Sequence, residues 1–244
     1  MKVQLITFCW NEMSVIPWAV EAWKAFADKV TVYDNGSDDG SVEYLQKNGI
    51  EVIQYGGSHL DNETLMNYKN NVWKVMDADI MVVCDMDEII TGHDVRGSME
   101  RMLRCGGTLC APIWYNLLWD KHPKGRFIEK CLDWGCYDPN PKTLIFDPHR
   151  IKEMNYCPGA HHCSPTGDVR YYQDGDIICL HVNNSLSLEY RIERFRKLNE
   201  RRCANDHRKG YAQHYGFSQE RISEEWENMR SRSIRMNELI KDTL

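Results

Sequence analysis

The first ninety residues alternate between short apolar runs and amphipathic stretches, and this alternation constrains the fold more than any other feature. Apolar runs typical of buried strands occupy residues 2–8, 29–34, 50–55 and 78–85. Helical patterns lie between them at residues 14–28, 42–48 and 62–76. Because repeated strand–helix–strand units place successive strands in parallel, the sequence predicts an α/β fold with a mostly parallel sheet and helices on both faces.

The pattern changes after Gly106. Strand-like runs at residues 108–119, 125–137, 142–147 and 174–182 are joined by irregular segments, and two helical patterns follow at 187–203 and 218–242. We therefore expect one domain over residues 1–185, with halves 1–92 and 93–185. A helical C-terminal extension over residues 186–244 is expected to pack on the same domain.

The composition favours a cytoplasmic protein. No apolar run approaches the ~20 residues that a transmembrane helix needs. The opening residues MKVQLITF are typical of a first strand, because their apolar stretch is short and no small-residue cleavage site follows. Cys9 and Cys84 fall within expected buried strands, and no CxxC pair occurs among the ten cysteines. This pattern indicates reduced thiols in a reducing compartment.

Three carboxylates, Asp85, Asp87 and Glu88, end the most apolar of the expected strands. Ligands of open parallel sheets bind beyond the carboxyl ends of the strands. Residues i and i+2 of a strand face the same side, so Asp85 and Asp87 can share one cleft. Neighbouring carboxylates disfavour each other's ionisation unless a cation lies between them, and oxygen ligands of this kind suit Mg²⁺ or Mn²⁺. The sequence therefore predicts a divalent-cation site here.

Three further motifs precede these carboxylates in order: TFCWNE after the first strand, VYDNGSDDGS after the second, and NYKNN on the helix before the fourth. Together with DMDE they resemble the nucleotide-sugar-dependent glycosyltransferases of the family 2 type, whose fold is called GT-A and is Rossmann-like. The resemblance implies a nucleotide-sugar-binding half at residues 1–92 and an acceptor-side half at 93–185. It also implies transfer of a sugar, with Mn²⁺ or Mg²⁺ as cofactor.

The resemblance implies a role for individual residues. Asp34 is expected to bind the donor's base, usually uracil, and Asp85 the ribose or the metal ion through water. Asp87 is expected to bind the metal directly, with His181 as a later metal ligand. The remaining expected donor-binding residues, which border the nucleotide or its diphosphate, are Thr7, Asn11, Lys69 and Asn70.

An inverting transfer also needs a base that deprotonates the acceptor hydroxyl. Asp133 is the first candidate and Glu88 the second. Aromatic residues of the middle segment are candidates for stacking on an acceptor sugar or base, and Trp119, beside charged residues, is expected to be the most exposed of them.

Residues 187–214 contain eight Arg and Lys against four Asp and Glu, although the whole chain has a net charge of −6. Three interpretations are open. The basic face is solvated and offers arginine to the donor diphosphate, it attracts an acidic acceptor such as DNA bearing a hydroxylated base, or it contacts an anionic membrane surface peripherally. A glycan is the other expected acceptor.

Two alternatives to a glycosyltransferase are considered. A nucleotidyltransferase also uses carboxylate-bound Mg²⁺, but it usually has a glycine-rich loop after the first strand, and TFCWNEMSVIPW contains no glycine. The second alternative is a non-catalytic carbohydrate- or nucleic-acid-binding protein of the same fold. Such a protein would not need the metal-ligand set Asp85, Asp87 and His181, so their presence argues against it. The sugar, the acceptor, the stereochemical outcome and the oligomeric state do not follow from the sequence.

Overall fold

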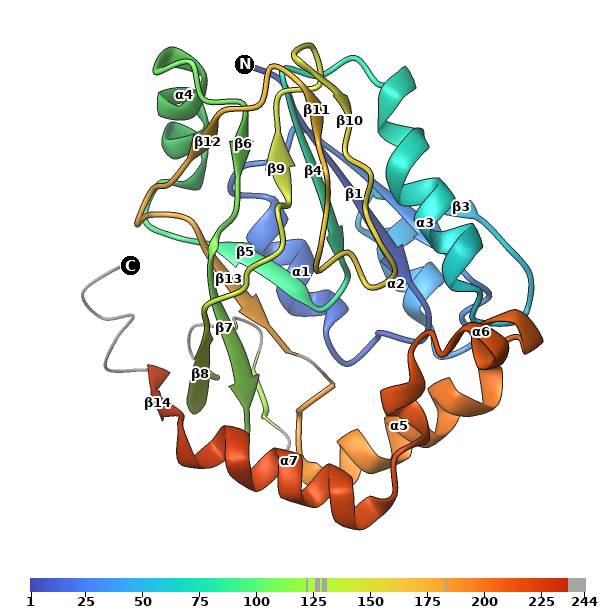
Figure 1. The fold of residues 1–244 in the computed structure, drawn as a ribbon. Coiled ribbons are helices and arrows are strands. Elements are labelled where there is room, and N and C mark those ends of the chain that lie inside the picture. Colours follow the sequence, from blue (N-terminus) through green and yellow to red (C-terminus); the bar gives the residue numbers. More distant parts are fainter. Residues whose placement is uncertain (122, 126–127, 129–130, 183, 237–244) are drawn as a thin grey trace.

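The computed structural model describes residues 1–121, 123–125, 128, 131–182 and 184–236. Its centre is a seven-stranded sheet with strand order β12-β6-β9-β4-β1-β2-β3 (Figure 1). The four expected N-terminal strands form a parallel half: β1 (Val3–Cys9), β2 (Lys29–Asp34), β3 (Glu51–Gln54) and β4 (Ile80–Asp85). The other half contains β9 (Ile145–Phe146), antiparallel to both neighbours, and the parallel pair β6 (Leu109–Cys110) and β12 (Tyr171–Tyr172). The predicted α/β class with a mostly parallel sheet is confirmed.

Helices cover both faces of this sheet, because alternate side chains of a strand point to opposite sides. Leu5 and Val82 belong to a hydrophobic cluster with residues of α1 (Ile16–Trp23) and α2 (Ser41–Lys47). Ile6 and Val83 belong to a second cluster, which includes residues of α3 (Asn62–Asn71) and of the following 3₁₀ turn η1 (Val72–Val75). The polar residues that follow β1, β2 and β4 therefore meet at the one sheet edge where these parallel strands end.

A second, five-stranded sheet has the order β14-β8-β7-β13-β5. Its strands are β5 (Glu88–Thr91), β7 (Ile113–Leu118), β8 (Trp134–Asp138), β13 (Ile178–His181) and β14 (Ile234–Arg235). Pairing places His181 opposite Glu88 on one side and opposite Asn116 on the other. Because paired residues point to the same face of a sheet, these three polar side chains form a row.

The remaining elements surround the two sheets. Helix α4 (Val95–Arg104) links β5 to β6, and β10 (Ile151–Glu153) pairs with β11 (Thr166–Gly167). The C-terminal region contains α5 (Leu188–Arg201), α6 (Ala204–Lys209), the 3₁₀ turn η3 (Gln213–Gly216) and α7 (Gln219–Ser231). Figure 1 shows α5, α6 and α7 along the lower side of the molecule, and Leu60 N donates to Arg201 O (2.8 Å), which joins α5 to the segment before α3.

Three local expectations differ from the structure. The run 108–119 is divided into β6 and β7 because Pro112, which lacks an N–H, interrupts it. The helix expected at 218–242 ends at Ser231, and the chain then forms β14, which pairs with β8; residues 237–242 lie outside the described residues. The helix expected at 42–48 is Ser41–Lys47 (α2), and Asp39 accepts hydrogen bonds from the N–H and the hydroxyl of its first residue, Ser41.

The expected strand at 125–137 is confirmed only in its last part, where β8 begins at Trp134. Residues 126–127 and 129–130 of that run lie outside the described residues. All ten cysteines are described, and each is a free thiol.

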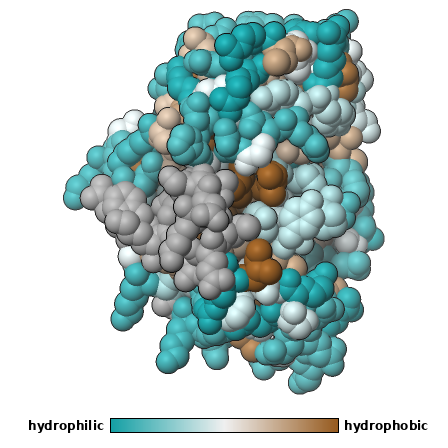
Figure 2. Space-filling model, turned by 90° about the vertical axis from the view of Figure 1, so that its left-hand side faces the viewer, coloured by the Kyte–Doolittle hydropathy of each residue, from teal (hydrophilic) through white to brown (hydrophobic). Residues whose placement is uncertain are grey.

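The exterior is mostly polar on the face drawn in Figure 2, where hydrophilic side chains cover most of the described surface around a few central hydrophobic residues. Within the described residues, no helix combines the length and the apolar character that crossing a membrane requires.

Candidate active site

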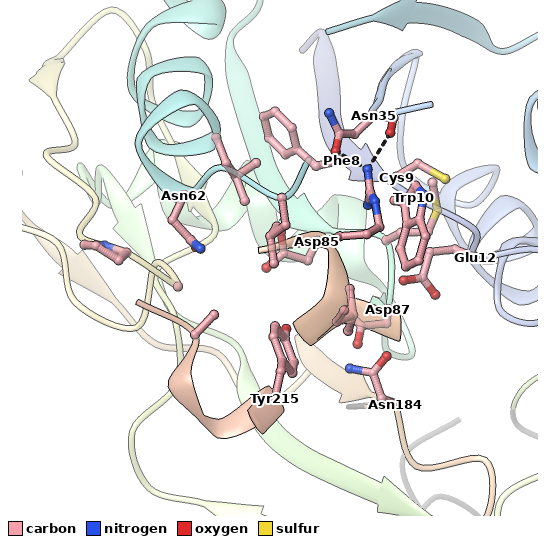
Figure 3. Close-up of a pocket in the computed structure, with 18 of the residues that line it drawn as sticks. Phe8, Cys9, Trp10, Glu12, Asn35, Asn62, Asp85, Asp87, Asn184 and Tyr215 are labelled. Carbon is pink, nitrogen blue, oxygen red and sulfur yellow. Dashed lines mark hydrogen bonds between the residues drawn. The ribbon is translucent and has the colours of Figure 1, made fainter. Parts of the chain in front are cut away.

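A cavity of about 450 Å³ opens where β1 and β4 end. Phe8, Cys9 and Trp10 line it from the end of β1, and Asp85 and Asp87 from the end of β4. Helix α3, the loop before β9, the end of β13, α5 and η3 supply much of the remaining wall, together with the segments after β2 and β3 and the loop between β10 and β11. Figure 3 shows Glu12, Asp85, Asp87 and Tyr215, which come from distant parts of the chain, around the same space.

Asp85 is held by two buried ammonium groups. Lys69 Nζ lies 2.5 Å from Asp85 Oδ1, and Lys142 Nζ lies 2.9 Å from Asp85 Oδ2. Lys142 also pairs with Glu88, which accepts a hydrogen bond from the Asp85 N–H (2.8 Å). Burial raises the pKa of Asp85, but the charges of Lys142 and Lys69 outweigh it and hold that pKa well below its usual range. Burial raises the pKa of Glu88, and Lys142 opposes that shift only in part.

Asp87 faces the end of β13. Its Oδ2 lies 3.5 Å from His181 Nε2, and both side chains are largely buried. Although burial raises the pKa of the Asp87 carboxyl, the neighbouring His181 brings it to a lower value than usual. Ligand atoms about 2.1 Å from one metal ion lie about 3–3.5 Å from each other, so Asp87 and His181 have the spacing of two ligands of one cation.

The structure separates Asp85 from this pair. Among the described residues, the set of three ligand side chains within 4.8 Å of one another is Asp61, Cys203 and Asp206, and not Asp85, Asp87 and His181. Asp61 and Asp206 are already occupied, since Asp61 caps α3 and Asp206 accepts from the Asn62 amide groups. The residues that fit a divalent ion in the cavity are therefore Asp87 and His181, with a substrate's oxygens completing its shell.

Helix α5 adds two guanidinium groups on the opposite wall. Arg194 pairs with Glu12 and donates to Trp10 O (2.6 Å). Arg201 donates to Asn35 Oδ1 (2.7 Å), and its guanidinium carbon lies 3.9 Å from the centroid of the Trp10 ring. Burial and the nearby Arg194 charge lower the pKa of Arg201 to about 10. The structure thus agrees with the interpretation that the basic helix offers arginine to this site.

The other four expected donor-binding residues do not line the cavity. Thr7 is fully buried within β1. Asp34 is buried and accepts hydrogen bonds from Gly36 N, Ser37 N, the Ser37 hydroxyl and Gln54 Nε2, so it organises the turn after β2.

Asn11 and Asn70 join loops to each other. The Asn11 amide donates to Asp38 Oδ1 (2.8 Å) and accepts from Asp38 N (2.8 Å). The Asn70 amide accepts from Tyr156 N (2.7 Å) and donates to Tyr156 O (3.1 Å), which fixes the loop before His161. Direct donor contacts of these residues stay predictions.

The two carboxylates expected as a base do not line the cavity. Asp133 pairs with Arg235 beside β14. Glu88 is 1% exposed and lies beneath Asp85. Glu12 does line the cavity, and burial raises its pKa to about 7 against the opposing charge of Arg194. It is therefore the cavity carboxylate whose pKa lies nearest to neutrality.

Two features were missed from the sequence. The first is Lys142, which lines the cavity but was not among the expected site residues. The signal that could have indicated it is the position of a lysine at the start of the apolar run 142–147. Trp119 was expected to be exposed, and this prediction is wrong. Its side chain is only 2% exposed, because it stacks on Trp18 with ring centroids 5.7 Å apart. Its neighbour His122 lies outside the described residues.

No protein-family model matches the chain, and no curated protein is significantly similar to it in sequence. Among solved structures, it is similar to glucosyl-3-phosphoglycerate synthase from Mycobacterium tuberculosis, with 17% identity over 46% of this chain and 44% of that one and a TM-score of 0.33. Complexes of that synthase contain UDP with Mn²⁺ or Mg²⁺, and one contains UDP-glucose and phosphoglyceric acid. The chain spans less than half of the synthase's length.

A second similar structure is S. aureus TarS residues 1–349, with 11% identity over 82% of this chain and 65% of that one and a TM-score of 0.47.

Proposed function

We propose that the protein is a metal-dependent glycosyltransferase that moves a sugar from a nucleoside diphosphate donor, UDP in the first instance, to a hydroxyl acceptor. The observation that carries the proposal is the pairing of Asp87 with His181 in the cavity that also presents Lys69, Lys142, Arg194 and Arg201. A carboxylate and an imidazole would suit Mn²⁺ or Mg²⁺, and the surrounding cationic side chains suit a phosphate-bearing ligand.

The charge balance of the cavity supports a cation requirement. Four cationic side chains line the cavity: Lys69, Lys142, Arg194 and Arg201. Four carboxylates balance them, Glu12, Asp85 and Asp87 in the cavity wall and Glu88 beneath Asp85, so the formal charge of the whole group is zero. A neutral cavity offers little net attraction to a diphosphate. One divalent ion on Asp87 and His181 makes it positive, which matches the charge of the ligand.

The chemistry follows from this arrangement. A bound divalent ion supplies charge neutralisation for a diphosphate leaving group. Arg201 and Arg194 are placed to hold the nucleotide end beside Trp10, while Lys69 and Lys142 keep Asp85 ionised and fixed. Stabilisation of charge that develops on the leaving group is usually the largest contribution to such a transfer. Glu12 is the carboxylate that the cavity offers as a base to the acceptor hydroxyl.

The proposal specifies only the class of the acceptor, which is a hydroxyl group on a glycan or on a hydroxylated base of DNA. The exposed charges of α5 do not favour DNA strongly, since Arg196 is paired with Glu193 and Glu200 on the same helix. A glycan is the acceptor to try first.

Thermal unfolding with a panel of nucleoside diphosphates, with and without Mn²⁺, tests the proposal. Ligands that bind the native state stabilise it by RT ln(1 + [L]/Kd), about 2.7 kcal/mol at 100-fold saturation. We expect a shift with one diphosphate that needs the metal and disappears in Asp87→Asn. Asp77→Asn, a carboxylate whose side chain is 92% exposed, is the matched control and should keep the shift.

The opposing results are equally specific. Metal-dependent binding of nucleoside triphosphates in preference to diphosphates and their sugars would support the nucleotidyltransferase alternative. A shift that survives in Asp87→Asn, or no shift with any nucleotide in the folded, metal-supplied protein, would overturn the proposal.

A further inference from the structure

The side chain of Asn116 on β7 lies against His181, and its orientation is determined by two other neighbours. Trp114 Nε1 lies 3.2 Å from Asn116 Oδ1, and an indole N–H can only donate. Asn116 Nδ2 lies 3.1 Å from Asp138 Oδ2, and an ionised carboxylate can only accept. Both contacts require the amide oxygen on the Trp114 side and the amide nitrogen on the Asp138 side.

This orientation decides which nitrogen of His181 carries the hydrogen. The Asn116 oxygen lies 2.7 Å from His181 Nδ1, so Nδ1 must be the donor of that hydrogen bond. In the neutral ring Nε2 then bears a lone pair, and Nε2 is the atom that lies 3.5 Å from Asp87 Oδ2. A lone pair and a carboxylate oxygen attract each other only through a shared cation, whether a proton or a metal ion.

We propose that Asn116, held by Trp114 and Asp138, is a positioning residue that keeps His181 in the Nδ1–H tautomer and so presents Nε2 to a divalent cation shared with Asp87. This inference rests on the proposed function for the identity of the cation, but the tautomer itself does not depend on it.

The fold makes this arrangement specific. The β7–β13 register places Asn116 directly opposite His181, and Trp114 precedes it by two residues on the same face. Asp138 lies on β8 two residues beyond Cys136, the partner of Asn116, and pairs with Trp114. Trp114 is 2% exposed and packs edge-on against the His181 ring, 5.1 Å between centroids, so water has little access to the bond between Asn116 and His181. Partners that orient metal ligands in this way typically change metal affinity 10–100-fold when they are removed.

The first experiment measures Mn²⁺ affinity by titration calorimetry on the full chain. Asn116→Leu, which keeps the size but removes the acceptor, should weaken Mn²⁺ binding at least about 10-fold. The double variant Asn116→Asp with Asp138→Asn exchanges amide and carboxylate, so residue 116 still accepts from Nδ1–H and from Trp114. It should bind Mn²⁺ within about 3-fold of the wild type, or more tightly. Asn71→Leu, an exposed asparagine on α3, is the control for the substitution itself and should change nothing.

The second experiment reads the tautomer directly by ¹⁵N NMR of the imidazole ring in the metal-free protein. The inference predicts the hydrogen on Nδ1 of His181 in the wild type, and a mixed or Nε2–H tautomer in Asn116→Leu. A wild-type ring with its hydrogen on Nε2 alone, or unchanged Mn²⁺ affinity in a folded Asn116→Leu, would overturn it. If the wild type binds no divalent ion, the proposed function fails, and the ring tautomer still decides the inference separately.

Discussion

Lys142 is the residue on which the electrostatics of the site depend most. It is buried and pairs with both Asp85 and Glu88, which are themselves largely buried. Burial disfavours its charge, but these two carboxylates raise its pKa well above the usual value. A buried ion pair that loses one partner leaves an uncompensated charge, which is among the most destabilising of single substitutions.

Lys142→Met is therefore expected to lower the free energy of unfolding by about 3–5 kcal/mol at pH 8, measured by urea denaturation. The deficit should shrink toward pH 5. Without Lys142, burial raises the pKa of Glu88 still further above its unfolded value, while Lys69 continues to pair with Asp85, so the folded state holds the Glu88 proton more tightly. Stability is then present at low pH and is lost as the pH rises through the folded pKa.

The control for this prediction is Lys152→Met, an exposed lysine of β10, which should change stability by no more than about 0.5 kcal/mol. A loss below about 1 kcal/mol in Lys142→Met, or a deficit that is independent of pH, would show that Lys142 does not hold the carboxylates as described.

Individual residues also show what sequence reasoning could reach. Asp85, Asp87, Lys69 and His181 were expected at the site, and all four line the cavity. Their partners were not predictable in the same way. The contact of Lys142 with Asp85 joins positions 57 residues apart, and no local pattern encodes it. Asp34 has a structural role that the motif alone did not indicate, since it accepts hydrogen bonds from the backbone of its own turn, while its contact with the donor's base stays a prediction.

At the scale of elements, α5 brings the C-terminal region to the nucleotide-binding half. Its apolar residues Phe195 and Leu198 are buried, and its Arg194 and Arg201 reach the ends of β1 and β2. Arg201 has no carboxylate partner among the described residues, although it donates to backbone and amide oxygens. It is the cation of the cavity wall that remains available to an anionic ligand.

Arg201→Met should weaken nucleoside diphosphate binding about 10-fold, because a hydrogen bond to a charged group contributes about 1.5–3 kcal/mol. Titration calorimetry with UDP in saturating Mn²⁺ measures this effect. Arg196→Met on the same helix is the matched control, since Arg196 is exposed and paired within its own helix. Equal affinities of Arg201→Met and Arg196→Met would exclude α5 from the donor site.

The elements of the first ninety residues were predictable because their periodicity is local, and β1 to β4 appear close to the expected positions. The middle of the chain was less so. Its strands are short and pair with distant segments, as β13 does with both β5 and β7, so the hydrophobic pattern alone does not reveal their register. The expectation of a single run at 108–119 failed at Pro112, where the chain passes from one sheet to the other.

At the scale of the whole molecule, two sheets meet at one cavity. The seven-stranded sheet supplies Asp85 and, just beyond it, Asp87, and the five-stranded sheet supplies His181. The row formed by Glu88, His181 and Asn116 runs across the second sheet. The site therefore depends on the register of strands whose paired residues lie 93 and 65 positions apart in the sequence. The motifs predicted a cation site beyond β4, and the resemblance already named His181 as a later ligand. Asn116, the residue proposed to orient His181, follows only from this register.

The most direct measurement of the central claim is the release of nucleoside diphosphate from a panel of nucleotide-sugars by the full chain in Mn²⁺. Donor hydrolysis by water reports leaving-group activation without knowledge of the acceptor. The account predicts release from one donor, UDP-sugars first, which stops on removal of the metal and falls at least 100-fold in Asp87→Asn but not in Asp77→Asn. Release that is unchanged in Asp87→Asn, or no release and no binding with any donor in folded protein, would contradict it.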